Sequence, residues 1–297
     1  MEDRPLAAAA HVVAAMAIIG LIDQFVQVIA RDGSLWTFHL LRAAMMWAMA
    51  LAWIAASGAR PRVVSWRGVA GRSAIMSAAM MIYFGALGFV PVAQAAAGLY
   101  AAPVFVAILS TVLLGRRLGP ARAAAAVAGF AGVLLVLAPD PGAMGLATLV
   151  PVASGAFYAV AVLATRLWCA REEALVLALG VFACMAAWGA GGIVVDAVWG
   201  LGDGFLGRGW VAPTAEVWLW TGVQAVGSLV AVVLLSRGYL LAEASFVSLF
   251  EYSVLGFSAL FGLLLWGERL GPGGLAGLAL ICGAGIAVAA LERRRAR

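Results

Sequence analysis

The sequence has few charged residues and no lysine. Only 11% of its 297 residues are charged, whereas a soluble domain has about 25%. All 19 basic residues are arginine, and the GxxxxGK[ST] motif that binds nucleotide phosphates is absent. The composition therefore disfavours a soluble domain, and the missing motif disfavours a chain that is driven by its own nucleotide hydrolysis.

Residues that carry metal or covalent chemistry are also scarce. The three cysteines, Cys169, Cys184 and Cys282, have no CxxC spacing, which disfavours a disulfide framework or a metal site. The two histidines, His11 and His39, belong to no HExxH motif, and GxSxG is absent as well. We therefore expect no cofactor and no enzymatic activity, and we expect the cysteines to pack as small apolar residues.

Long apolar runs dominate what is present. The chain is 65% hydrophobic with a mean hydropathy of +1.05, and a helix needs about 20 apolar residues to cross a bilayer. The sequence predicts an all-α polytopic membrane protein with short connections. Its ten predicted transmembrane helices are 6–29, 35–57, 68–89, 93–114, 120–138, 146–168, 174–198, 216–237, 244–266 and 273–291.

If the N-terminus is cytoplasmic, most of the arginines lie on the cytoplasmic side of the membrane. Fifteen then lie in or near cytoplasmic segments, and three, Arg31, Arg208 and Arg269, lie outside. This positive-inside bias predicts an inner-membrane protein with both termini in the cytoplasm. The arginines form no single stripe, so no nucleic-acid partner is expected.

A six-residue motif, which we call the corner, occurs twice with one residue changed. GRRLGP at 115–120 returns as GERLGP at 267–272, and each copy closes a stretch of equal length that opens on a tyrosine, Tyr100 or Tyr252. The sequence therefore predicts two five-span halves, 1–142 and 143–297. Because five is odd, the second half enters the membrane from the opposite side, which is the inverted-topology repeat of many secondary transporters.

These features resemble the EamA-type members of the drug/metabolite transporter superfamily. The resemblance covers essentially the whole chain and includes FHLLR at 38–42, the two corners, and GFAGVLLV at 129–136. It implies a permease with a central cavity walled mainly by spans one to four and six to nine, which opens to one side at a time.

Within this superfamily, the YddG-type amino-acid exporters are the nearest functional comparison. The resemblance then implies export of amino acids, aromatic ones included. Importers of larger metabolites, such as S-adenosylmethionine or riboflavin, share the architecture, as do multidrug efflux permeases. The expected partners are a small-molecule substrate and membrane lipid, with no obligate protein partner.

Asp23, Arg42 and Glu251 lie well inside predicted spans, where a charge is costly unless it faces a cavity or a partner. Asp23 and Arg42 are each about 10 Å deep on adjacent helices, given a rise of ~1.5 Å per residue. They could form a structural ion pair, or one could meet the substrate. Glu251 lies about eight residues into span nine from the cytoplasmic side. It could couple transport to protons or bind a cation, or it could be a protonated packing residue.

Uncharged polar residues in the spans complete the candidate site. Tyrosine suits the wall of a mixed polar and apolar cavity, and a glutamine amide in a span needs a partner. Core packing is the alternative role for each of them. The candidate substrate-binding residues are Tyr83, Tyr100, Tyr158, Tyr252, Gln24, Arg42, Gln94 and Gln224, with Asp23 and Glu251 as candidates for coupling or charge.

Two other classes of membrane protein fit less well. A structural or scaffolding protein would explain the packing but not a carboxylate within a span. A channel would show a ring of charge or a filter-like loop, and neither is visible. Pro103, which falls in predicted span four, predicts a bend there.

Overall fold

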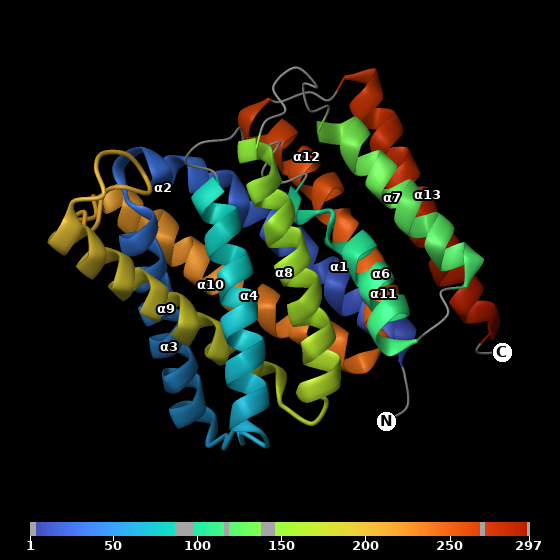
Figure 1. Ribbon diagram of the computed structural model, residues 1–297, viewed down its shortest axis with the longest axis horizontal. Helices are drawn as coiled ribbons and strands as arrows, with labels where there is room; N and C mark the ends of the chain where they lie inside the picture. Colours follow the sequence, from blue (N-terminus) through green and yellow to red (C-terminus); the bar gives the residue numbers. More distant parts are fainter. Residues whose placement is uncertain (1–3, 87–97, 116–118, 138–145, 268–270, 296–297) are drawn as a thin grey trace.

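The computed structural model describes residues 4–86, 98–115, 119–137, 146–267 and 271–295, and the regular structure within these ranges is helical (Figure 1). The first half contains α1 (Pro5–Ile22), the 3-10 helix η1 (Asp23–Phe25), α2 (Val26–Asp32), α3 (Leu35–Ser57), α4 (Trp66–Ala86), α6 (Ala102–Leu114) and α7 (Pro120–Leu137). The second half contains α8 (Leu146–Trp168), α9 (Ala174–Trp199), α10 (Ala215–Leu241), α11 (Ala244–Val247), the 3-10 helix η3 (Ser248–Tyr252), α12 (Ser253–Trp266) and α13 (Pro272–Arg295).

These helices are long and apolar enough to cross a membrane. Seven segments in the described ranges meet that criterion, and three shorter apolar helices lie in α6, α7 and α13. The continuous segment Pro5–Asp32 joins α1, η1 and α2. The prediction of an all-α polytopic membrane protein is thus confirmed.

The burial pattern is the reverse of that in a soluble protein. Large apolar side chains such as Trp66, Val112 and Leu264 are among the most exposed. Charged side chains such as Arg42 and Arg72 are only 4% and 3% exposed. An apolar exterior around buried polar groups suits a protein whose outer face contacts lipid.

The helix contacts follow the symmetry of the two halves. When each helix is replaced by its counterpart in the other half, one observed contact becomes another observed contact. The contact of α4 with α8 corresponds to that of α10 with α1, and the contact of α6 with α8 corresponds to that of α12 with α1. Two further pairs, α3 with α9 and α7 with α13, correspond to themselves. Figure 1 shows these two pairs at opposite ends of the molecule's long axis. This interchange is expected of an internal repeat.

The repeated corner has the same local structure in both copies. Gly115 ends α6 with φ 62°, and Gly267 ends α12 with φ 70°. A left-handed residue closes a helix most easily when it is glycine. Pro120 and Pro272 then begin α7 and α13, where a proline costs no hydrogen bond. Residues 116–118 and 268–270, including the charge reversal, lie outside the described residues.

Within the described residues, two membrane-spanning segments depart from α geometry. The segment Pro5–Asp32 contains η1 at Asp23–Phe25, and the segment Ser248–Trp266 begins with η3 at Ser248–Tyr252. Near Pro103 the chain turns at residues 100–101 before α6 begins at Ala102, so this proline lies in the first turn of a helix. A 3-10 stretch within a long helix, such as η1 or η3, often marks a functional position.

Hydrogen bonds join the two halves at one end of the bundle. The segment between α9 and α10 meets the start of α3, where the Ser34 hydroxyl donates to the Gly209 carbonyl at 2.6 Å. The Trp36 indole donates to Leu206 at 2.8 Å. We call this set of contacts the neutral seam, because carbonyl oxygens accept both bonds.

A second set of contacts between the halves uses carboxylates. Glu172 accepts a hydrogen bond from the backbone amide of Val64 at 3.0 Å, and Glu173 accepts one from that of Arg62 at 3.3 Å. Both acids lie between α8 and α9, and their donors lie between α3 and α4. We call these contacts the charged seam.

We propose that the chain consists of the two repeats 1–142 and 143–297. The interchangeable packing and the matching corners support this division. The boundary itself falls at residues 138–145, outside the described residues. Both termini lie toward the same end of the bundle in Figure 1, as an even number of spans requires.

We expect single cysteines at Gly119 and Gly271 to label from opposite faces of the membrane. A side chain at either glycine meets no atom within 4 Å, so both substitutions should be tolerated. The measurement is labelling by a membrane-impermeant maleimide in right-side-out and inverted vesicles, in a chain whose native cysteines are replaced. A cysteine at Arg60 serves as a control and should label with Gly119. Labelling of Gly119 and Gly271 from one face would contradict the inverted repeat.

Candidate functional site: the central cavity

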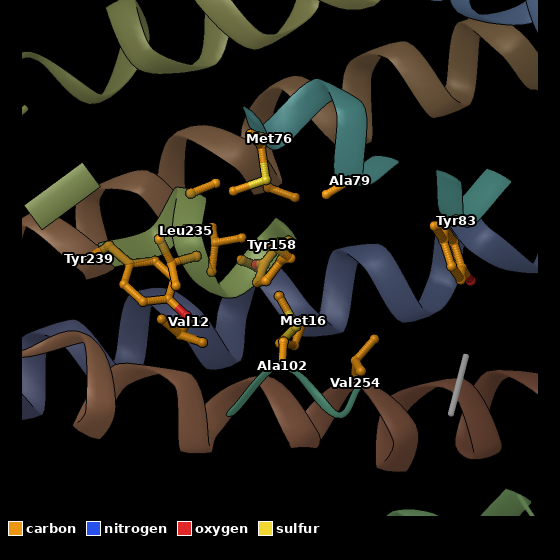
Figure 2. Packing of buried hydrophobic residues seen from close by; sticks show 14 of the residues in the cluster. Val12, Met16, Met76, Ala79, Tyr83, Ala102, Tyr158, Leu235, Tyr239 and Val254 are labelled. Atoms are coloured by element: carbon orange, nitrogen blue, oxygen red, sulfur yellow. The ribbon is translucent and has the colours of Figure 1, made fainter. Parts of the chain in front are cut away.

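A cavity of about 130 Å³ lies at the centre of the helix bundle, between the two halves. Its wall is formed mainly by α1, α4, α8, α9, α10 and the region around η3. Much of the wall is apolar, with Met16, Met76, Met80 and Met185 among the lining residues. Figure 2 shows the packing of buried residues around it: the lining residues Met16 and Tyr158 lie between Tyr83, which also lines the cavity, and Tyr239, which lies outside its wall.

Asp23 and Arg42 both line the cavity, but they do not form an ion pair with each other. The Asp23 carboxylate accepts a long hydrogen bond of 3.5 Å from the Gln224 amide. The Arg42 guanidinium lies over the rings of Phe38 and Phe84, at 4.7 and 5.3 Å from their centroids. Such cation–π contacts stabilise a buried cation without neutralising it. A negative and a positive group therefore both face the cavity.

His39, which does not line the cavity, contacts the Arg42 guanidinium. Arg42 Nη2 lies 3.1 Å from His39 Nδ1. Because a guanidinium only donates, Nδ1 must accept, which places the imidazole proton on Nε2. Arg42 Nε and His39 Nε2 are both buried without a hydrogen-bond partner. The arginine is thus positioned by one nitrogen and retains donor capacity for a ligand.

Glu251 forms a second polar group with two tyrosines. Its Oε1 accepts hydrogen bonds from the hydroxyls of Tyr239 at 2.6 Å and Tyr158 at 2.8 Å. Arg72 also lines the cavity. It is held by a bond from Nε to the Thr165 hydroxyl at 2.8 Å and by another to the Leu177 carbonyl. This second group, like the first, contains one acid and one arginine.

Polar side chains of the wall are spread along the cavity. Arg72 and Tyr83 are both on α4 and both line the cavity. Eleven residues separate them, which corresponds to about 16 Å along a helix. The cavity is therefore an elongated, largely apolar space with charged and hydroxyl groups toward both ends.

The structure brings six of the predicted site residues to the cavity wall. These are Asp23, Arg42, Tyr83, Tyr100, Tyr158 and Glu251.

The remaining predicted residues are elsewhere. The Gln24 amide bonds to Gly20 and Ser258 carbonyls, which ties α1 to α12. The Gln224 amide bonds to the Ile22 carbonyl at 2.7 Å, behind the wall. Tyr252 is buried against Gly129 of α7 and is not part of the wall, and its hydroxyl has no partner. Gln94 lies outside the described residues.

Sequence reasoning missed other cavity residues. The sequence groups Arg72 with the arginines of the cytoplasmic side, and the structure buries it in the second turn of α4, where it lines the cavity. Its position inside predicted span 68–89 was the available indication. Tyr239 bonds to Glu251, and the cavity methionines Met16, Met76, Met80 and Met185 had no distinguishing pattern. Within the described residues, no cluster of three or more His, Cys, Asp or Glu could hold a metal ion.

Comparison with known proteins connects this architecture to transport. Residues 6–138 match the EamA-like transporter family. A riboflavin transporter of Rhizobium johnstonii is 29% identical over 213 residues, which is 71% of this chain and 66% of that protein. A riboflavin transporter of Brucella anthropi is 25% identical over 72% of this chain and 73% of that protein. An uncharacterized transporter of Helicobacter pylori is 27% identical over 74% and 72%, respectively.

The fold itself has a counterpart among solved structures. One crystal structure superposes with a TM-score of 0.77 and 22% identity, covering 97% of this chain and 99% of the other. The helical architecture, the central cavity and the similar sequences agree. The chain is a multi-pass membrane protein, and its residues 6–138 are similar to the EamA-like transporter family.

Proposed function

We propose that the protein transports a metabolite that combines a flat aromatic or heterocyclic part with several hydrogen-bonding groups, and that riboflavin is the first compound to test. The observation that carries this proposal is the cavity wall. Tyr83, Tyr100, Phe84 and Phe182 line it together with methionines. Aromatic rings and thioethers offer flat, polarizable surfaces against which a heterocycle can stack. The riboflavin transporters among the relatives support the same chemistry.

The polar groups at the two ends of the cavity suit the polar groups of such a ligand. Arg42 can present two parallel N–H donors to carbonyl oxygens of a heterocycle. At the other end, Ser236 and Arg72 can bond to hydroxyls of a side chain. A hydrogen bond between a buried ligand group and a cavity side chain gives selectivity, because an analogue that lacks the ligand group leaves that side chain unpaired.

Amino acids are the second candidate, and one observation favours them. Asp23 and Arg42 both face the cavity without pairing. An amino acid carries an ammonium and a carboxylate that could pair with these two side chains. Export of amino acids therefore stays a proposal beside transport of riboflavin.

The proposed mechanism is alternating access by movement of the two halves around the cavity. At about 130 Å³, the cavity is smaller than the ~300–1,000 Å³ typical of ligand pockets. Riboflavin would therefore enter when helices of the two halves part. The distribution of the arginines favours an inner-membrane location with cytoplasmic termini. In that orientation the neutral seam is on the outer side.

We expect reconstituted protein to take up radiolabelled riboflavin into vesicles, with saturation. The same vesicles would be tested with aromatic amino acids, S-adenosylmethionine and a cationic dye, each with and without a pH gradient. Empty vesicles supply the baseline. Uptake of an amino acid with no uptake of riboflavin would reverse the order of the two candidates. Uptake of the dye alone would contradict both.

We expect Arg42→Gln to raise the KM for riboflavin about tenfold or more, because a hydrogen bond to a charged group contributes ~1.5–3 kcal/mol and ~1.4 kcal/mol corresponds to a factor of ten. Arg42→Lys keeps the charge but loses the planar pair of donors, so an intermediate KM is expected. Arg31→Gln removes an exposed arginine outside the cavity and should leave KM unchanged. Equal values of KM for Arg42→Gln and the parent protein would exclude Arg42 from the substrate site.

We expect cysteines at Ser228 and Ser236 to react with a small water-soluble thiol reagent, because both serines line the cavity. Riboflavin should slow the reaction. A cysteine at Ser154 is the matched control, since its hydroxyl is buried in the contact of α8 with α4, where it donates to Ala79. Reaction at Ser154 as fast as at Ser228, or no protection by any transported substrate, would show that the cavity is not the passage.

A further inference from the structure

Glu251 uses only one of its two carboxylate oxygens in the protein's hydrogen bonds. The side chain is 6% exposed and lines the cavity. The hydroxyls of Tyr158 and Tyr239 both donate to Oε1. Oε2 receives no hydrogen bond from the described residues, and it is not among their fully buried, unpartnered atoms. The carboxylate is thus fixed in orientation by Oε1, and Oε2 is left to the cavity.

No cation neutralises this carboxylate within the described part of the chain. The elements packed on η3 are α1, α6, α7, α11, α12 and α13. Of these, α6, α11 and α12 contain no titratable residue. The titratable residues of the others are His11 on α1, Arg122 at the start of α7, and Cys282 and the segment 292–295 on α13. The His11 ring bonds to the Ala7 carbonyl.

Arg72 and the tyrosines are the other groups that share this end of the cavity. The Nε and Nη1 atoms of Arg72 are bonded to Thr165 and to the Leu177 carbonyl. It makes no ion pair with Glu251, and the neighbouring Tyr252 makes no hydrogen bond. Asp23, the other cavity carboxylate, differs because it accepts a bond from Gln224 and has Arg42 close enough to act on it electrostatically.

An unpaired carboxylate in a low-dielectric site is costly while it is charged, and protonation removes that cost. Two tyrosine donors partly stabilise the charged form, so neither form is excluded by its surroundings. A group that can hold or release a proton where a cavity opens alternately to two sides is suited to carry protons. Its place in a 3-10 stretch at membrane depth fits a coupling site, because irregular backbone there is tolerated where it lines a cavity.

We propose that Glu251 Oε2 binds the proton that couples transport to the transmembrane proton gradient, while Tyr158 and Tyr239 hold the carboxylate in place. In this step a hydronium ion gives its proton to Oε2 when the cavity is open to one side. The resulting carboxylic acid returns the proton to water when the cavity is open to the other side. The coupling rests on the proposed transport function, whereas protonation of Oε2 does not.

The first test needs no substrate. Infrared spectra of the purified protein are recorded as the pH is lowered. We expect a carboxylic-acid C=O band that appears reversibly, is missing in Glu251→Gln and is kept in Glu216→Gln, which alters an acid in the first turn of α10 outside the cavity. Tyr239→Phe should shift the frequency of this band, because one bond to Oε1 is lost. A band that stays in Glu251→Gln, or vanishes instead in Asp23→Asn, would overturn the proposal.

The second test measures coupling in vesicles. We expect Glu251→Gln to lose the effect of an imposed pH gradient on riboflavin uptake and to keep exchange of riboflavin at equal pH on both sides. Glu251→Asp retains a carboxyl group and should keep part of the gradient effect. Full gradient dependence in Glu251→Gln would overturn the coupling role, as would dependence on a sodium gradient in place of a proton gradient.

The two tests separate the possible failures. If riboflavin and amino acids do not move in the parent protein, the proposed function fails, and the infrared titration still decides whether Glu251 takes up a proton. If Glu251→Gln is inactive in exchange as well, Glu251→Asp decides. Recovery of the gradient effect supports the coupling role, and exchange without the gradient effect contradicts it.

Discussion

A polar group inside a bilayer must find its partner within the protein, and much of this structure follows from that constraint. Many large apolar side chains are exposed, and the charged side chains of Arg42, Arg72 and Glu251 are buried between helices. Among the described residues, the 3-10 helices η1 and η3 each carry a carboxylate, and both carboxylates face the cavity. Irregular backbone and a buried carboxylate therefore occur together at the cavity wall.

The two halves share a scaffold but not a chemistry. Their helix contacts interchange, and both corners end on a left-handed glycine. Glu251, however, has Leu99 as its counterpart by the 152-residue spacing of the corners, and both line the cavity. Sequence divergence at the cavity thus provides groups that one half alone possesses, so the wall can present different side chains to the two ends of a ligand.

The helices could be predicted from the sequence because the bilayer sets the length and the polarity of every span. The charged candidates could also be predicted, since charge within a span is rare. The direction of each side chain could not, because a helix that is apolar on all faces has no periodic stripe to orient it. Tyr239 and Tyr252 are equally plausible in the sequence, yet Tyr239 bonds to Glu251 and Tyr252 packs on α7. Gln224 illustrates the same limit, because its amide serves a carbonyl of α1.

The two seams that join the halves differ in their response to the surrounding solution. The neutral seam ends on carbonyl oxygens, whereas the charged seam ends on Glu172 and Glu173. Salt screens the interactions of accessible charges and leaves those of neutral dipoles nearly unchanged. Of the two acids, Glu173 is exposed whereas Glu172 is only 5% exposed. Ionic strength would therefore weaken the bond to Glu173 and act little on the bond to Glu172.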